Sequence, residues 1–129
     1  MASRRSTTNV SLRPAASYAG VVGQVLVQAR QEVGLGQAEL AAAVGVSQPT
    51  WSRIERGSQA LTIEQLHAAA EKLRVPPSVI LARAERVSDH LRSQGVRVTS
   101  RREVDPADGL VAIGLAALAV MTIAALTKK

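Results

Sequence analysis

The sequence predicts an all-α protein, with five helices, a flexible arm before them and a hydrophobic helix after them. Two observations support this fold class. Apolar residues recur every three or four positions between residues 20 and 94, and glycines interrupt the pattern where helices should end. The 129-residue chain contains one Trp, one Tyr and no Phe or Cys. The core must therefore be built from Ala, Val, Leu and Ile, without disulfides or thiolate metal sites.

Residues 1–19 are predicted to form a flexible basic arm. They mix Ser, Thr, Arg and small residues without sustained periodicity, and they lack the apolar run of a secretory signal. Arg4, Arg5 and Arg13 give residues 1–20 three positive charges and no acid, whereas residues 21–94 hold eight bases against seven acids. Such an arm suits an anionic polymer or a membrane surface, but a solvated tail has the same composition.

Residues 20–94 hold the five predicted helices. The first carries apolar residues at three- and four-residue intervals and ends at Gly34; these residues are Val22, Val25, Leu26, Ala29 and Val33. The second runs from Gln37 to Gly45 with Leu40, Ala41 and Val44 on one face. The third has Ser47 as N-cap and Pro49 in its first turn, and it ends at Gly57. Two short helices joined by a tight turn predict a helix-turn-helix.

The fourth and fifth helices complete the predicted domain. Thr62 and Gln65 form a capping box, followed by an apolar stripe of Ile63, Leu66, Ala69, Ala70 and Leu73. The fifth helix begins at Pro76 and Pro77 and ends at Gly95. Its residues Ile80, Ala84, Val87 and Leu91 form a heptad-like seam, longer than one small domain needs to cover. This excess predicts a partner helix.

Polar motifs coincide with this apolar spacing. They are Arg30, Gly34 and Leu35, the runs QAELA (37–41), GVS (45–47) and SRIERG (52–57), and the stretch LTIEQLHAAAEKLRV (61–75). From about Val21 to Leu81 the chain resembles the Cro/cI-type helix-turn-helix domain of phage repressors and bacterial regulators of the xenobiotic-response-element family. It departs from that pattern at Gly36, where a Ser or Thr cap is usual, and at Trp51, where Ile or Val is usual.

The resemblance implies that the third helix lies in the major groove of double-stranded DNA. On a helix that follows Ser47, Trp51 and Ile54 turn inward, while the polar residues turn outward. The resemblance places Gln48, Pro49 and Arg53 at base-reading positions and Gln37 and Thr50 on phosphates. The predicted DNA-binding set is Gln37, Ser47, Gln48, Pro49, Thr50, Ser52, Arg53 and Arg56.

The remaining polar residues predict structural roles rather than catalysis. The resemblance implies a buried, structural ion pair between Arg30 and Glu55. The sequence has no phosphate-binding glycine loop, no nucleophile elbow and no acid pair with a supporting histidine. His67 and His90 lie far apart in sequence, without ligand-spaced partners. We therefore expect no enzyme activity, no metal and no cofactor.

The C-terminal third is a separate region. Residues 95–108 are predicted to be a linker or a short strand exchanged between subunits, because Val96 and Val98 alternate with polar residues. Residues 109–127 are predicted to form a hydrophobic helix, since positions 109–126 carry no charge and would cover about 27 Å. That helix is either a membrane anchor or an oligomerisation helix, in which Gly114 would allow close approach.

Together these features predict a bacterial or phage DNA-binding regulator, acting as a dimeric repressor that reads the major groove with residues 47–56. Its expected partners are double-stranded DNA and a second copy, or a higher homo-oligomer, with a membrane contact through residues 109–126 if that segment is an anchor. The protein is expected in the cytoplasm, either free or tethered to the inner membrane. An antitoxin or a membrane-tethered interaction protein could use the same fold, but the retained Gln48, Arg53 and Arg56 favour DNA.

Overall fold

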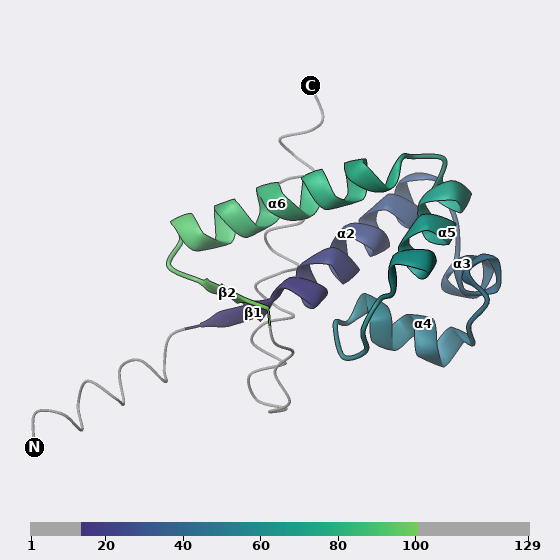
Figure 1. Ribbon diagram of the computed structural model, residues 1–129, viewed down its shortest axis with the longest axis horizontal. Coiled ribbons are helices and arrows are strands. Elements are labelled where there is room, and N and C mark those ends of the chain that lie inside the picture. Colours follow the sequence, from purple (N-terminus) through teal and green to yellow (C-terminus); the bar gives the residue numbers. More distant parts are fainter. Residues whose placement is uncertain (1–13, 101–129) are drawn as a thin grey trace, which may run out of the picture.

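The computed structural model describes residues 14–100, which form five helices and two short strands. The elements are β1 (Ala15–Ser17), α2 (Tyr18–Glu32), α3 (Gln37–Val44), α4 (Gln48–Glu55), α5 (Ile63–Leu73), α6 (Pro77–Ser93) and β2 (Arg97–Thr99). The long helices α2 and α6 lie side by side (Figure 1). Helix α4 packs against α2, α3 packs against α4 and α5, and α5 packs against α6. The predicted helical fold with five helices is confirmed, with a small sheet added to it.

Side-chain caps mark the starts of α2, α4 and α5, whereas α3 and α6 begin without one. The Ser47 hydroxyl accepts a hydrogen bond from the Thr50 N–H at 3.2 Å, as predicted for the start of α4. At α5, Thr62 Oγ1 accepts from the Gln65 N–H at 3.0 Å while Gln65 Oε1 accepts from the Thr62 N–H at 2.9 Å. The helix-ending glycines of the sequence analysis all have positive φ; they are Gly34, Gly45, Gly57 and Gly95.

The two strands correct the predicted limits of the arm and the linker. β1 pairs with β2 in parallel, with Ala15 opposite Arg97 and Ser17 opposite Thr99. The predicted arm of residues 1–19 was therefore too long, because residues 15–17 lie in the sheet and α2 begins at Tyr18. The strand predicted within residues 95–108 is present, but it pairs within its own chain rather than with another subunit. Residues 1–13 and 101–108 lie outside the described residues.

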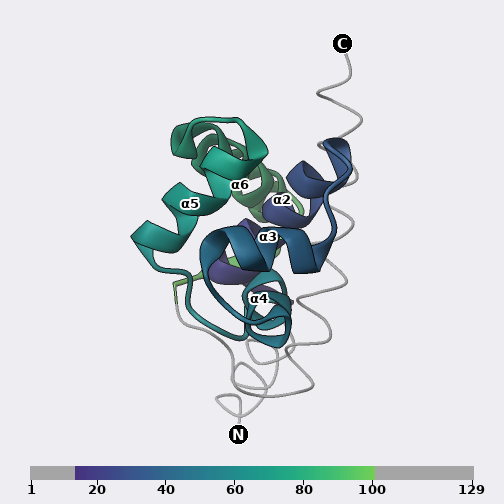
Figure 2. The same cartoon turned by 90° about the vertical axis from the view of Figure 1, so that its right-hand side faces the viewer.

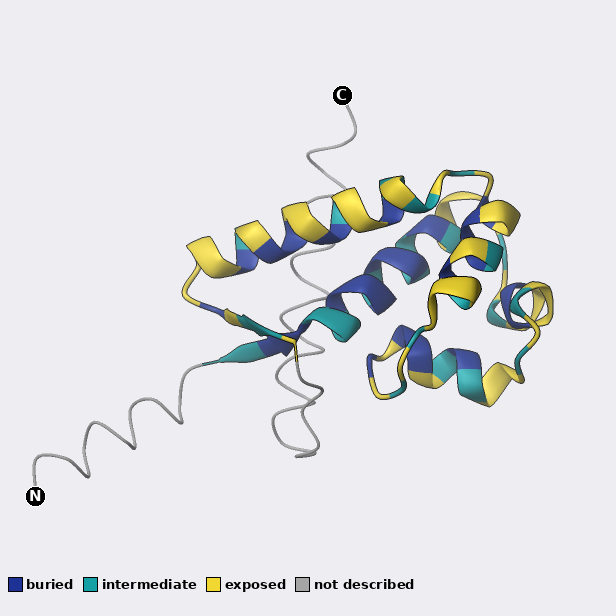
Figure 3. Ribbon diagram, viewed as in Figure 1, coloured by how far each residue is buried: buried dark blue, intermediate teal, exposed yellow. Residues whose placement is uncertain are grey.

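The seam along α6 corrects a second prediction. Ile80, Ala84, Val87 and Leu91 are each at most 1% exposed, and all four belong to the core of this chain. They pack in the core that α6 forms with α2 and β2, so the side of α6 that faces α2 is buried (Figure 3). The interpretation that this seam needs a partner helix was wrong, because residues more than fifty positions earlier in the chain already cover it.

Two residues assigned to apolar stripes lie at the surface instead. Ile63 is 82% exposed and Val33 is 53% exposed. Val33 is the C-cap of α2, and Ile63 is the first residue of α5, so each lies at a helix end where no neighbouring element of residues 14–100 covers it.

None of the helices within residues 14–100 is long and apolar enough to cross a membrane. The predicted hydrophobic helix, residues 109–127, lies outside the described residues.

Glycines bring α2 and α4 unusually close together. A Cβ atom on Gly23 would overlap the backbone carbonyl groups of Ile54 and Glu55 at the end of α4. A Cβ on Gly57, just after α4, would overlap the backbone of Gly20, and Gly57 also has a φ of 77°. A side chain at either position would prevent this approach, so the two glycines allow α4 to lie close against α2. Figure 2 shows α4 below α3, on the side of the molecule away from α6.

Candidate nucleic-acid interface

A buried carboxylate, that of Glu55, holds α4 against α2 and α3. Glu55 is 2% exposed. Its Oε2 accepts from Arg30 Nε and from Trp51 Nε1, both at 2.7 Å. Its Oε1 accepts from Gln37 Nε2 at 2.7 Å and from Arg30 Nη2 at 3.2 Å. The carboxylate therefore has four hydrogen bonds from three helices, which compensates for the cost of burying its charge.

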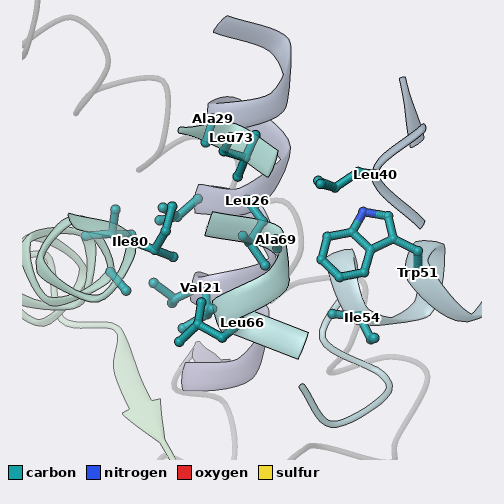
Figure 4. Packing of buried hydrophobic residues seen from close by; sticks show 14 of the residues in the cluster. Val21, Leu26, Ala29, Leu40, Trp51, Ile54, Leu66, Ala69, Leu73 and Ile80 are labelled. Carbon is teal, nitrogen blue, oxygen red and sulfur yellow. The ribbon is translucent and has the colours of Figure 1, made fainter. Parts of the chain in front are cut away.

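Trp51 faces the interior, as the phase of the third helix predicts. Its side chain is fully buried, and in Figure 4 the indole lies near Leu40 and Ile54. The hydrogen bond from the indole N–H to Glu55 was not predicted from the sequence. The signal was available in the spacing, because residues four apart on a helix share a face. This bond explains how an indole can replace the usual aliphatic residue without an unpaired N–H in the core.

The opposite face of α4 is open to solvent. Gln48, Pro49, Arg53 and Arg56 are exposed, as is the N-cap Ser47, whereas Thr50 and Ser52 are half-buried. Glu55 is the one acid between residues 47 and 57, and it is buried and paired with Arg30. The charges that this helix shows to solvent are therefore both positive. A cationic helix face is the kind of surface that attracts a phosphate backbone.

A chain of hydrogen bonds orders the Arg53 side chain on this face. Ser47 Oγ donates to Thr50 Oγ1 at 3.0 Å, and Arg53 Nη2 donates to the same Thr50 oxygen at 3.2 Å. Arg53 Nε donates to Gln59 Oε1 at 3.1 Å. Arg53 remains exposed, so its guanidinium is positioned by these contacts but not sealed against its own domain.

The contact between Gln59 and Arg53 was not predicted from the sequence. Gln59 lies in the loop between α4 and α5, where no periodicity or capping pattern marks it. Its position beside Arg53 depends on how the loop folds back after Gly57.

Gln37, predicted to contact a phosphate, instead makes a hydrogen bond inside the domain. It is half-buried at the start of α3, and its amide nitrogen donates to Glu55 rather than pointing freely outward. One N–H of that amide is thus used inside the domain, which leaves the other for a phosphate. The remaining predicted DNA-binding residues lie together on α4 or at its N-cap and C-cap.

Residues 14–100 contain no group of three or more His, Cys, Asp or Glu side chains that could hold a metal ion. His67 lies on α5 and His90 on α6, on separate elements of the fold.

Comparison with known proteins identifies the domain. Residues 21–83 match a family described as "Helix-turn-helix domain". Residues 21–83 are a helix-turn-helix domain. This confirms the resemblance to Cro/cI-type domains and makes the segment a DNA-binding domain.

Two solved structures resemble the helix-turn-helix domain and its flanking elements. Both are crystal structures of the clp gene regulator ClgR from Corynebacterium glutamicum. The first is 26% identical with a TM-score of 0.58, and the match covers 60% of this chain and 82% of that chain. The second is 28% identical with a TM-score of 0.51, covering 53% and 88%. No curated protein matches the chain.

Proposed function

We propose that the protein is a sequence-specific transcriptional regulator that acts as a dimeric repressor. The observation that carries this proposal is the outward face of α4, where Arg53 is exposed and held between Thr50 and Gln59. The helix-turn-helix domain supplies the framework, and the similarity to ClgR, a clp gene regulator, supports a regulatory role.

In this proposal α4 enters the major groove and reads base edges. The guanidinium of Arg53 can donate two hydrogen bonds to O6 and N7 of guanine, and the amide of Gln48 can pair with N6 and N7 of adenine. Pro49 would contact a thymine methyl group. Because Arg53 is already held by two neighbours, it loses less rotamer freedom on binding than a free arginine would.

Phosphate contacts would flank these base contacts. Ser47, Thr50 and Ser52 offer hydroxyl groups on or beside the first turns of α4, and Arg56 offers a charge at its end. The second N–H of Gln37 is available at the start of α3, where free backbone amides also favour an anion. These groups would orient α4 in the groove without reading sequence.

The protein would act as a dimer because one recognition helix contacts only a few base pairs. A single module of this size makes few base contacts, so two copies bound to half-sites about 34 Å apart would be needed for specific binding. Repression would result because the bound dimer occludes the polymerase.

Replacing Arg53 by alanine is expected to weaken specific DNA binding by about 1–3 kcal/mol, because one bidentate base contact is lost. The measurement is a gel-shift titration with a site that the protein selects from random-sequence DNA. Arg86→Ala is the matched control, since Arg86 is an exposed arginine on α6, a helix that lies away from α4 (Figure 1). Equal affinities for both variants and the unaltered protein would refute the proposed reading helix.

Replacing Gln59 by alanine tests whether its contact orders Arg53. We expect DNA affinity to fall by about 0.5–1.5 kcal/mol, the usual net contribution of one hydrogen bond. In an Arg53→Ala background the same replacement should change affinity little, because the contact is already absent. If the two losses simply add in the same gel-shift titration, then Gln59 acts independently of Arg53.

A further inference from the structure

An apolar groove opens beside the helix-turn-helix unit. It has a volume of about 430 Å³ and lies between the first turns of α2, the loop from α4 to α5, the start of α5 and the second turn of α6. Val22, Ile54, Leu61 and Leu66 contribute to its walls, and none of its lining residues carries a charge. It is thus large enough for several apolar side chains.

The surface around this groove is unusually apolar for the described domain. Within residues 14–100, three large hydrophobic side chains are clearly exposed, and two of them, Ile63 and Leu81, line the groove. They are 82% and 40% exposed. Exposed apolar residues that gather at a concave site indicate that something covers them.

The pairing of β2 with β1 brings the chain that follows α6 to this groove. β2 runs parallel to β1, so the chain turns back from the end of α6 and reaches Thr99 opposite Ser17, where α2 is about to begin. The next residue, Ser100, itself lines the groove together with Tyr18 and Ala19 at the start of α2. The last described residue therefore lies at the mouth of the groove.

The residues that follow have the composition that such a groove would bind. Positions 101–108 form a polar stretch of eight residues that could span at most about 28 Å. Positions 109–126 then contain no charged residue. An uncharged segment on a short tether has a high effective concentration at a site next to the tether, which favours its own groove over that of another copy.

We propose that the apolar segment 109–126 docks into this groove of its own domain and covers Ile63 and Leu81. The burial of apolar surface on both sides drives the contact. Gln59 lines the groove and also accepts the hydrogen bond from Arg53, so the docked segment lies next to the face of α4. The proposal concerns only the groove and the tail, and it stands whether or not α4 reads DNA.

Cysteine accessibility in the full chain tests this proposal, because the natural chain has no cysteine. Ile63→Cys is made alone and together with Ile113→Asp and Val120→Asp, which place charges in the tail. The rate at which a maleimide modifies the introduced thiol is then measured at several protein concentrations. We expect modification to be at least about tenfold faster with the charged tail, and the protection by the natural tail to be independent of concentration.

Ala43→Cys, at an exposed position on α3 that does not line the groove, is the control and should react at the same rate with either tail. Equal rates for the Ile63→Cys thiol with both tails would overturn the proposal. Protection that disappears on dilution would assign the groove to the tail of a second copy and would also overturn it. The same holds if adding phosphatidylcholine vesicles abolishes protection, since the segment would then prefer a membrane.

Discussion

Replacing Glu55 by glutamine is expected to lower the free energy of unfolding by about 3–5 kcal/mol, the usual cost of removing one member of a buried ion pair. The carboxylate accepts hydrogen bonds on both oxygens. A glutamine amide keeps one oxygen and turns an NH2 group toward the N–H groups of its neighbours, which cannot accept. Arg30, with 15% of its side chain exposed, would also lose its counter-charge.

Urea unfolding followed by Trp51 fluorescence measures this loss. The matched control is Glu71→Gln, which makes the same chemical change at an exposed position on α5 and should alter stability by less than about 0.5 kcal/mol. If Glu55→Gln lowered the free energy of unfolding by no more than Glu71→Gln does, the hydrogen bonds to Glu55 would contribute little to stability. A loss of several kcal/mol is a large part of the total stability of a small domain, so Glu55→Gln should also bind DNA poorly at about 37 °C.

Replacing Gly23 by alanine is expected to destabilise the domain by about 1–3 kcal/mol, although alanine is the better helix former. The added methyl group would overlap the carbonyl groups of Ile54 and Glu55. These are backbone atoms, so no side chain can rotate away to make room. α4 must move away from α2, which also loosens the Glu55 contacts.

The control is Gln24→Ala at the neighbouring position on α2, which is half-buried and already carries a Cβ atom, so this change adds no atom there. Thermal unfolding followed by circular dichroism should show a lower midpoint for Gly23→Ala and little change, or a small gain, for Gln24→Ala. If Gly23→Ala were as stable as the unaltered protein and bound DNA equally well, the close crossing of α2 and α4 would not be needed to position α4.

Much of the fold was readable from local sequence. Caps such as Ser47 and Thr62, helix-ending glycines such as Gly45, and the inward phase of Trp51 each depend on residues within one or two turns of the same helix. The outward set on α4, which includes Gln48 and Arg53, follows from the same phase. These features can be read from the sequence because the interactions that produce them join residues only three or four positions apart. Such residues share one face of a helix, whose period is about 3.6 residues.

Tertiary structure alone decided the features that join distant parts of the chain. The pairing of residues 15–17 with residues 97–99 has no local signal, because such short strands are specified by each other and by the core beneath them. The covering of the α6 seam by α2, the four bonds to Glu55 and the placement of Gln59 beside Arg53 likewise join residues from different elements. Local periodicity predicts which side of a helix is buried but not which partner buries it, since that choice depends on packing of the whole chain.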